Sequence, residues 1–212
     1  MNKKIFLIVK RTFDIIVSLI AIMLLAIPMI IVAICIKKED GSPVIFKQIR
    51  MGKNLKPFYI YKFRTMKTQR KELESDLSHE EMVTKVGKIL RATSIDELPQ
   101  LFNILKGDMS FIGPRPWILE YYEWFTDEQK RRSEVKPGIT GLAQAKGRNA
   151  LNVFKKIDYD IEYVDNMSLW LDIKIFFLSI VAVLKKTSAE ISEMGIKEEL
   201  EELKEQREKI HS

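Results

Sequence analysis

An uncharged apolar segment, residues 15–36, most constrains what this chain can fold into. A helix rises about 1.5 Å per residue, so this segment would reach roughly 33 Å, against about 30 Å for the hydrocarbon core of a bilayer. A cleaved signal peptide fits poorly, because the apolar run is too long and no small-residue cleavage site follows it. The segment therefore predicts a membrane helix near the start of the chain.

Two arrangements of this helix are compatible with the sequence. Pro28 lies near its middle, where proline removes one backbone donor and bends a helix. A single kinked span is one arrangement, and a bent re-entrant helix with both ends on one side is the other. Basic residues flank both ends, which gives little of the asymmetry that orients a simple span and favours the re-entrant form. They are Lys3, Lys4, Lys10 and Arg11 before the segment, and Lys37 and Lys38 after it.

The charge and the sparse cysteine and histidine content narrow the functional classes. The 212 residues include 35 Lys and Arg against 29 Asp and Glu, a net charge of +6. This excess is compatible with anionic partners such as phosphorylated substrates or acidic lipids, and equally with simple solubility. Cys35 is the only cysteine, and the histidines are His79 and His211. An intramolecular disulfide is excluded, and a cysteine zinc site or a Ser-His catalytic pair is not expected.

The segment after the membrane helix predicts a hairpin followed by short helices. Residues 43–48 and 58–63 are rich in β-formers, and residues 50–54 between them have the composition of a turn. Residues 83–90 predict a short amphipathic helix. Residues 99–105 predict a second helix, with proline in its first turn and Gly107 just past its end. The polar residues 67–81 predict a loop or a surface helix.

The C-terminal half contains two aromatic segments and a charged tail. Residues 117–125 predict either a core helix or a helix in the headgroup layer, where Trp and Tyr are favoured. Residues 163–186 are interrupted by Asp172 and Lys174, so they are a weak candidate for a membrane span and a better one for a helix that lies at the membrane surface. Residues 190–209 predict a solvated helix with many i,i+4 charge pairs.

Two adjacent carboxylates, Asp96 and Glu97, are the first candidates for chemistry. Ser94 and Glu97 match a capping box, which would make Glu97 only a helix cap. Pro99 argues against that register, and a helix that starts near Leu98 leaves both acids just ahead of its positive end. One carboxylate could then attack a substrate while the other holds a metal, although acids at helix starts are common.

Basic residues in stiff or β-rich surroundings are the second set of candidates. Arg115 lies between Pro114 and Pro116, which fix the backbone and present a planar fork suited to phosphate. Arg148 follows Gly147, where backbone amides could cradle a phosphate. The alternative for Arg115 is a stiff surface turn without a binding role. The sequence around Arg148 is, by itself, only weak evidence for a phosphate site. The other candidates are Lys62 and Arg64, two residues apart on a predicted strand, and Arg91, five residues before Asp96.

Several blocks in order resemble the bacterial sugar transferases, the small monotopic polyprenyl-phosphate phosphoglycosyl transferases. The blocks are Tyr61–Met66, Asp96–Asn103, Lys106–Pro116 and Pro137–Gln144, and the likeness extends from Lys10 to about Lys186. Residues 147–150 look most like the subgroup that uses N-acetylated sugars such as diacetylbacillosamine. Two departures stand out: Ile27 precedes Pro28 where the family often has serine, and the tail after Lys186 has no counterpart.

The resemblance implies a membrane enzyme that moves a sugar-1-phosphate from a UDP-sugar to undecaprenyl phosphate. Asp96 would attack the β-phosphate and release UMP, and the lipid phosphate would then attack the aspartyl phosphosugar. Glu97 would hold Mg²⁺ on the diphosphate. The substrate-binding side chains would be Lys62, Arg64, Arg91, Arg115 and Arg148.

The resemblance also implies an α+β fold with a re-entrant membrane helix broken at Pro28, a hairpin packed with several helices, and interfacial amphipathic helices. The expected divisions are a membrane helix over residues 1–38, a transferase domain over 39–186 and a charged helical tail over 187–212. The expected location is the cytoplasmic face of the bacterial inner membrane, with membrane lipids and downstream glycosyltransferases as partners and no nucleic acid. The alternative from another class is a non-catalytic membrane adaptor that binds anionic lipid or a partner enzyme.

Overall fold

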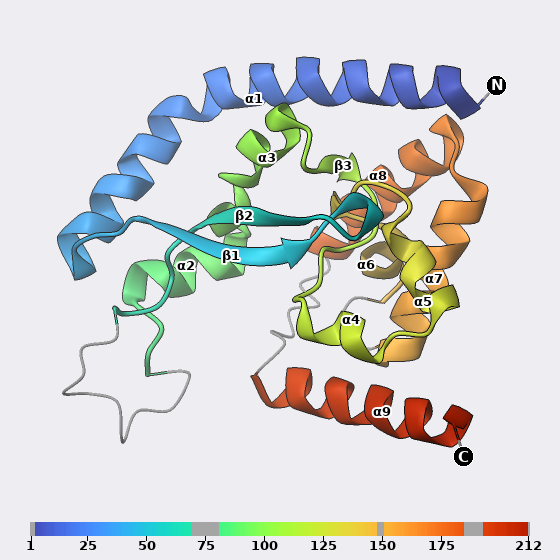
Figure 1. Ribbon diagram of the computed structural model, residues 1–212. Helices are drawn as coiled ribbons and strands as arrows, with labels where there is room; N and C mark the ends of the chain where they lie inside the picture. The colour runs from blue at the N-terminus through green and yellow to red at the C-terminus, as the bar shows by residue number, and fades with distance from the viewer. Residues whose placement is uncertain (1–2, 69–80, 148–150, 185–192, 212) are drawn as a thin grey trace.

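The computed structural model describes residues 3–68, 81–147, 151–184 and 193–211, and these form a mixed α+β structure (Figure 1). This confirms the predicted fold class. The longer elements, in chain order, are α1 (Lys3–Asp40), β1 (Ile45–Met51), β2 (Pro57–Phe63), α2 (Lys85–Thr93), α3 (Gln100–Lys106), β3 (Ser110–Ile112), α4 (Glu120–Trp124), α5 (Asp127–Lys130), β4 (Gly138–Thr140), α6 (Leu142–Lys146), α7 (Val153–Asn166), α8 (Leu169–Leu184) and α9 (Glu193–His211). Short 3₁₀ turns lie at η1 (Lys53–Leu55), η2 (Ile95–Glu97) and η3 (Arg131–Ser133).

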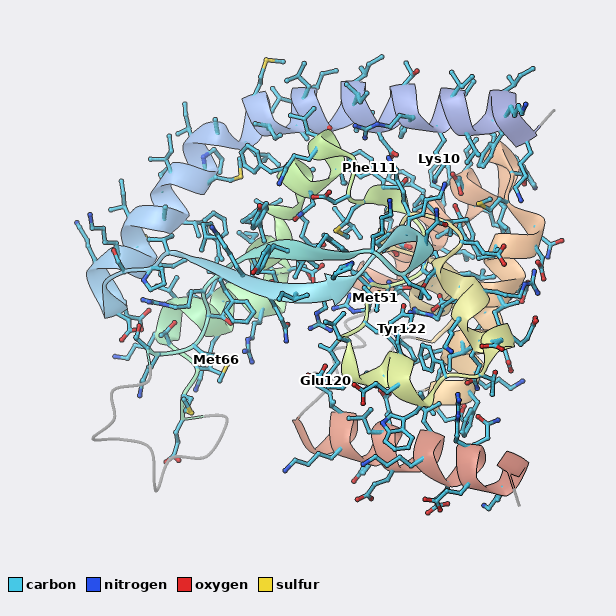
Figure 2. All side chains as sticks on the ribbon, in the orientation of Figure 1. Lys10, Met51, Met66, Phe111, Glu120 and Tyr122 are labelled. Carbon is cyan, nitrogen blue, oxygen red and sulfur yellow. The ribbon has the colours of Figure 1, made fainter. Side chains whose placement is uncertain are left out.

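Helix α1 lies along one side of the molecule and bends partway along its length (Figure 1). It contains Pro28, whose ring and missing donor account for a bend. Side chains project from its outer face away from the rest of the molecule (Figure 2). Most of its large apolar side chains are exposed, and among the described residues α1 is the one helix long and apolar enough to cross a membrane.

Both ends of α1 make polar contacts with the part of the protein that follows it in the chain. Near its start, Lys10 pairs with Asp172 of α8 at 2.6 Å, and the buried Asp14 accepts from Ser110 Oγ at 3.0 Å. Figure 2 labels Lys10 and Phe111 where α1 lies over this part of the body. Near its end, Glu39 accepts from the backbone amides of Lys85 and Val86 at the start of α2. A straight span would carry these two ends to opposite sides of a membrane, so this geometry favours the re-entrant alternative.

The predicted hairpin and the two helices after it are present. Strands β1 and β2 pair antiparallel, with Ile45 opposite Phe63 and Met51 opposite Pro57. The helix predicted over residues 83–90 is α2, shifted toward the C-terminus because Thr84 caps it by accepting from Gly87 N. Helix α3 ends at Gly107, whose φ of 95° is readily adopted by glycine.

Strands β3 and β4 pair parallel and bring two distant motifs together. The segment after β3 carries Arg115, and β4 lies in the Pro137–Gln144 block that resembles the sugar transferases. Glycines permit the close approach, because a Cβ on Gly113 would lie 2.4 Å from Lys136 O and one on Gly138 would lie 2.2 Å from Gly113 N. The backbone of Gly138 also donates to Pro114 O at 2.9 Å, which fixes the start of the Gly113–Pro116 segment.

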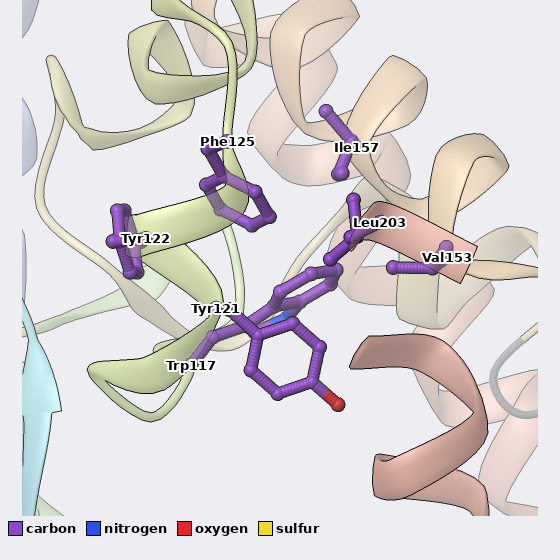
Figure 3. Packing of buried hydrophobic residues seen from close by; sticks show 7 residues of the cluster. All are labelled: Trp117, Tyr121, Tyr122, Phe125, Val153, Ile157 and Leu203. Carbon is purple, nitrogen blue, oxygen red and sulfur yellow. The ribbon is translucent and has the colours of Figure 1, made fainter. Parts of the chain in front are cut away.

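The aromatic segment over residues 117–125 is core. Trp117, Tyr121 and Phe125 are buried, and their rings contact one another (Figure 3). The headgroup-layer alternative for this segment is therefore wrong. The segment over residues 163–186 divides differently: Tyr163 is buried at the end of α7, whereas α8 exposes Trp170, Phe176 and Phe177.

The prediction of a solvated tail helix is wrong for α9, which packs below α4 (Figure 1). Leu203 is fully buried in the cluster that contains Trp117, Tyr121 and Phe125 (Figure 3). Polar contacts reinforce the packing, since Glu199 accepts from Tyr121 Oη at 2.7 Å and pairs with Lys156. The residues that dock recur at i, i+4 and i+7, as Ile196, Leu200 and Leu203, which is an apolar stripe within a charged helix.

Candidate functional site

The two adjacent carboxylates lie in η2, directly ahead of α3. Ser94 ends α2 in the left-handed conformation, with φ of 57°, and makes no side-chain cap for the next turn. This agrees with the argument from Pro99 against a capping box. The backbone then reverses so that Asp96 and Glu97 precede Pro99, where the positive end of the α3 dipole favours their ionised forms.

Helix α3 is fixed at its middle and at its C-terminal end, which sets the position of the carboxylates. The buried Asn103 accepts from Tyr61 N at 3.1 Å and donates to Tyr59 O at 2.7 Å, so it binds α3 to the free edge of β2. At the other end, Arg11 of α1 donates to the last carbonyls of α3, those of Ile104 and Leu105, at 2.6 and 2.8 Å. These contacts fill the hydrogen-bonding capacity that a helix terminus leaves open.

Lys62 of β2 lies between the two carboxylates. Its Nζ is 2.6 Å from Glu97 Oε1 and 3.9 Å from Asp96 Oδ2. The same Glu97 oxygen accepts from Arg115 Nη2 at 3.4 Å. The structure therefore brings together four of the predicted site residues, Lys62, Asp96, Glu97 and Arg115, from segments far apart in the sequence.

The surroundings give the two carboxylates different proton affinities. Burial opposes ionisation of Glu97, but Lys62 and Arg115 outweigh it and lower its pKa to about 2. Burial raises the pKa of Asp96, and the nearby Glu97 adds to this, whereas Lys62 and Arg91 act in the opposite direction. Glu97 is thus the firmly charged partner, and Asp96 is a poorly solvated carboxylate beside it. Paired acids with separated pKa values are typical of sites where each has its own role.

The other three predicted site residues, Arg91, Arg64 and Arg148, differ in their relation to the carboxylate cluster. Arg91 donates from Nε to Thr65 Oγ1 at 2.9 Å, and its charge reaches Asp96. Arg64 is not brought to the cluster: its guanidinium binds Asp40 O and Gly41 O at 2.8 and 2.9 Å, at the end of α1. Its backbone N–H donates to Val44 O at 2.9 Å, so the pairing of the hairpin continues one residue past β2, while its side chain is engaged at the end of α1. Arg148 lies outside the described residues.

Sequence reasoning missed Arg50. This residue lines a cavity of about 30 Å³ together with Lys62, Glu97 and Arg115. Burial and the neighbouring Arg115 lower its pKa to about 10. Its residue range was assigned to a turn, but β1 continues to Met51 and pairs Arg50 with Phe58. Strand parity was the available signal, since residues opposite 58, 60 and 62 share the face of Lys62.

The backbone of Arg115 rests on a buried arginine. Arg132, with a side chain only 1% exposed, donates from Nη2 to Arg115 O at 2.7 Å. The same guanidinium pairs with the buried Asp160, donates to Tyr122 Oη at 2.7 Å and lies 4.4 Å from the ring centre of Trp117. Arg132 therefore holds the segment that presents Arg115 to Glu97.

An apolar groove of about 920 Å³ lies between α1, the hairpin and the start of α3. Its lining includes Ile22, Met29 and Phe63, and it reaches Pro99, two residues from Glu97. Lys47 and Lys106 also line it, and both lie over the ring of Tyr61 at 5.8 and 5.3 Å. The groove is suited to a long apolar chain with a negative group near its charged side.

The carboxylates also fit a magnesium ion that is shared with a substrate. Mg²⁺ prefers oxygen ligands and is commonly bound by one or two carboxylates together with substrate phosphates. In the described part of the chain, no group of three or more Asp, Glu, His or Cys side chains forms a metal cage. Asp96 and Glu97 supply oxygen donors without such a cage, so they are compatible with an ion that a diphosphate helps to hold.

A family model and individual relatives both match this chain to sugar transferases. A model described as bacterial sugar transferase matches residues 5–186. The chain is 46% identical to an uncharacterized sugar transferase, EpsL, of Bacillus subtilis, over 84% of this chain and 88% of that protein. It is 42% identical to a UDP-glucose:undecaprenyl-phosphate glucose-1-phosphate transferase of Klebsiella pneumoniae, over 81% of this chain and 39% of that protein.

A third relative differs in its sugar. The chain is 42% identical to a UDP-N-acetylgalactosamine-undecaprenyl-phosphate N-acetylgalactosaminephosphotransferase of Aeromonas hydrophila, over 83% of this chain and 44% of that protein. The chain thus spans less than half the length of the Klebsiella and Aeromonas relatives. The likeness covers the α1-to-α8 part of the chain, and the family match ends before α9.

Proposed function

The chain belongs to the bacterial sugar transferase family, and from this membership we propose that it transfers a sugar-1-phosphate from a UDP-sugar to undecaprenyl phosphate and releases UMP. Relatives from Klebsiella and Aeromonas are named for transfer of this kind. The observation that carries the proposal is the cluster in which Lys62 and Arg115 hold Glu97 beside a half-buried Asp96.

The residues divide the reaction into two displacements at one phosphorus. A carboxylate oxygen of Asp96 bonds to the β-phosphorus, and the bond from that phosphorus to the bridging oxygen breaks, so the electron pair leaves with UMP. An oxygen of the lipid phosphate then bonds to the same phosphorus, and the Asp96 carboxylate leaves. Lys62, placed between Asp96 and Glu97, would keep Asp96 ionised and neutralise phosphate charge.

We expect Glu97 to hold Mg²⁺ with the donor diphosphate. When bound, the ion would neutralise phosphate charge that otherwise repels the Asp96 carboxylate. Removal of divalent metal with EDTA should stop UMP release, and added Mg²⁺ should restore it. Glu97→Gln should raise the Mg²⁺ concentration needed for half-maximal rate. A rate that is unaffected by EDTA would contradict the role of Mg²⁺ while leaving the transferase proposal intact.

We further propose that α1 is re-entrant and that the catalytic body lies on the cytoplasmic face of the inner membrane. The contacts from Lys10 and Asp14 at one end and Glu39 at the other support this, because both reach the same body. The exposed aromatics of α8 would lie at the membrane surface beside α1. The groove that reaches Pro99 would receive the polyprenyl chain, with surrounding membrane lipids on its open side.

The identity of the transferred sugar is a separate and more specific part of the proposal. An N-acetylated sugar was expected from residues 147–150, of which 148–150 lie outside the described residues. Relatives named for glucose and for N-acetylgalactosamine are each 42% identical to the chain, so identity does not select between them. Downstream glycosyltransferases that would extend the lipid-linked sugar likewise stay a prediction.

UMP release by purified protein tests the proposal. The protein in detergent or nanodiscs, with Mg²⁺ and undecaprenyl phosphate, is offered a panel of UDP-sugars with and without N-acetyl groups. Intact-mass analysis without the lipid acceptor runs in parallel. We expect UMP release with at least one sugar, and an added mass of one phosphosugar that Asp96→Asn abolishes together with turnover.

Other outcomes separate the parts of the proposal. Turnover with no adduct even on rapid quenching would favour direct transfer over the aspartyl intermediate. Folded, membrane-competent protein that releases no UMP with any donor would favour the adaptor alternative, for which Asp96→Asn should change nothing.

A further inference from the structure

Arg50 is a half-buried cation whose hydrogen bonds the fold leaves incomplete. Its Nη2 donates to Gln48 Oε1 at 2.6 Å, but in the described structure its buried Nε has no hydrogen-bond partner. Leaving a buried donor unpaired costs on the order of 1–3 kcal/mol, and more for a charged group. Buried polar atoms in folded proteins are nearly always paired, so the unpaired Nε calls for an explanation.

The cavity beside Arg50 concentrates positive charge. Lys62 and Arg115 line it with Arg50, and Glu97 is the carboxylate on its wall. The hydrogen bonds that Glu97 accepts come from Lys62 and Arg115. Three cations against one carboxylate give the lining a net charge of +2. A pocket of this composition is complementary to a doubly negative group.

We propose that Arg50 and Arg115 together bind one phosphate group of a substrate. Both side chains are planar forks, which match phosphate oxygens with two parallel hydrogen bonds. The inference rests on the proposed function and deepens it, because it assigns a role in phosphate binding to a residue outside the catalytic cluster. The phosphate belongs to the nucleotide or to the lipid acceptor, and the experiment below separates these two sources.

The packing of Arg115 permits a phosphate to enter. The cavity of about 30 Å³ has room for water and is otherwise closed by the surrounding side chains. The Arg115 side chain is 43% exposed and can move outward. Its backbone stays in place, because Arg132 donates to Arg115 O at 2.7 Å. Entry of a phosphate thus needs one side chain to move while the Pro114–Pro116 segment keeps its position.

A purely structural role for Arg50 makes a different prediction. Met51, the next residue, donates its backbone N–H to Trp117 O at 3.0 Å, so the end of β1 is attached to the aromatic core. If Arg50 only supports this attachment, its replacement lowers the melting temperature and leaves ligand binding unchanged. If Arg50 binds a phosphate group, its replacement weakens binding of the phosphate ligand and leaves the melting temperature unchanged or higher.

Binding measurements on the full-length protein in nanodiscs distinguish these roles without relying on turnover. The probes are UMP, inorganic pyrophosphate and undecaprenyl phosphate, and the variants are Arg50→Gln and Arg50→Lys. Lys56→Gln is the matched control, since it removes a positive charge from an exposed position in the same hairpin. We expect the Kd for the bound probe to rise about 10- to 100-fold in Arg50→Gln, less in Arg50→Lys, and less than about twofold in Lys56→Gln.

The probe that responds identifies the source of the phosphate. A raised Kd for UMP and pyrophosphate assigns the site to the donor, and a raised Kd for undecaprenyl phosphate alone assigns it to the acceptor. A double-mutant cycle with Arg115→Gln should be non-additive, because both side chains bind one group. The proposal is overturned if folded wild-type protein binds none of the probes, if no Kd changes, or if the cycle is additive.

These outcomes are separate from those of the transferase proposal. Absence of UMP release with retained, Arg50-dependent probe binding would overturn the proposed reaction alone. UMP release with Arg50-independent binding would overturn the phosphate site alone.

Discussion

Arg132 is a fully buried arginine and Arg50 is a half-buried one, and the fold treats their hydrogen bonds differently. In Arg132, Nε and Nη2 bind Asp160, Nη1 binds Tyr122 Oη, and the guanidinium stacks over Trp117. Arg50 has Gln48 as its side-chain partner, an unpaired Nε and a second arginine nearby. The difference teaches that this fold completes the hydrogen bonds of a cation that supports the backbone and leaves incomplete those of a cation that faces the site.

One atom on the Arg132 side of this comparison also lacks a hydrogen-bond partner among the described residues. Asp160 accepts from Arg132 with Oδ2, whereas its buried Oδ1 has no partner among the described residues. The carboxylate depends entirely on Arg132 for compensation of its charge. A structural pair of this kind should be costly to break from either side but far less costly to remove as a whole.

Breaking the Arg132 pair should give the largest effect. Arg132→Met leaves Asp160 buried and unpaired, so we expect the free energy of unfolding to fall by about 3–5 kcal/mol. Denaturant unfolding of the protein in mild detergent measures this. The double variant Arg132→Met with Asp160→Leu should recover most of the loss. A loss under about 1 kcal/mol in the single variant would show that the pair does not support the fold.

Removal of the exposed site arginine should affect catalysis and spare the fold. Arg115→Gln removes one of the two cations that hold Glu97, and we expect kcat/KM to fall about 10²- to 10³-fold. Unfolding free energy should change by less than about 1 kcal/mol, because the side chain is solvent-accessible. Steady-state UMP release and denaturation give the two numbers. A large loss of stability would place Arg115 with Arg132, as a structural residue.

Shortening the buried leucine of α9 tests whether the tail helix supports the Arg132 side of the comparison. Leu203 is fully buried against the cluster that includes Trp117 and Tyr122. We expect Leu203→Ala to lower the free energy of unfolding by about 2–3 kcal/mol. Glu202→Ala, at an exposed position on the same helix, is the control for general effects on α9. Equal stability of Leu203→Ala and the wild type would mean that α9 is not docked in solution.

Removal of the incompletely bonded arginine should have the smallest effect on stability. Arg50→Met removes a half-buried charge with a buried, unpaired donor, so we expect the free energy of unfolding to stay constant or to rise by up to about 1 kcal/mol. Thermal unfolding with and without the probe that the binding measurements identify reports it, and the stabilisation by that probe should be smaller than in the wild type. A loss as large as that of Arg132→Met would erase the distinction between the two arginines.

Local signals in the sequence predicted the elements that depend on local physics. The apolar run gave α1, β-rich segments gave the hairpin, and Pro99 and Gly107 bounded α3. Predictions about what a side chain binds were less secure. Arg64 continues the hairpin pairing through Val44 O, but its guanidinium binds backbone carbonyls at the end of α1, a contact that the strand pattern does not indicate.

The parts that could not be predicted depend on contacts between distant segments. Arg132 has no local feature that marks it as buried, and its partners come from α4 and α7. Docking of α9 was missed because charged residues outnumber the narrow stripe of Ile196, Leu200 and Leu203. Asn103 was read only as part of a motif, although its amide joins α3 to β2 and thereby sets the distance from Lys62 to Glu97.

One short helix fixes how far the proposed chemistry stands from the bilayer. Helix α3 has seven residues and rises about 10 Å along its axis. Arg11 of the membrane helix donates hydrogen bonds to carbonyls in its last turn, and the two acids directly precede its first turn. With α1 embedded, the reaction plane would lie at one constant height. An acceptor lipid could then keep its tail immersed while its head group alone rises to meet a donor that arrives from the water.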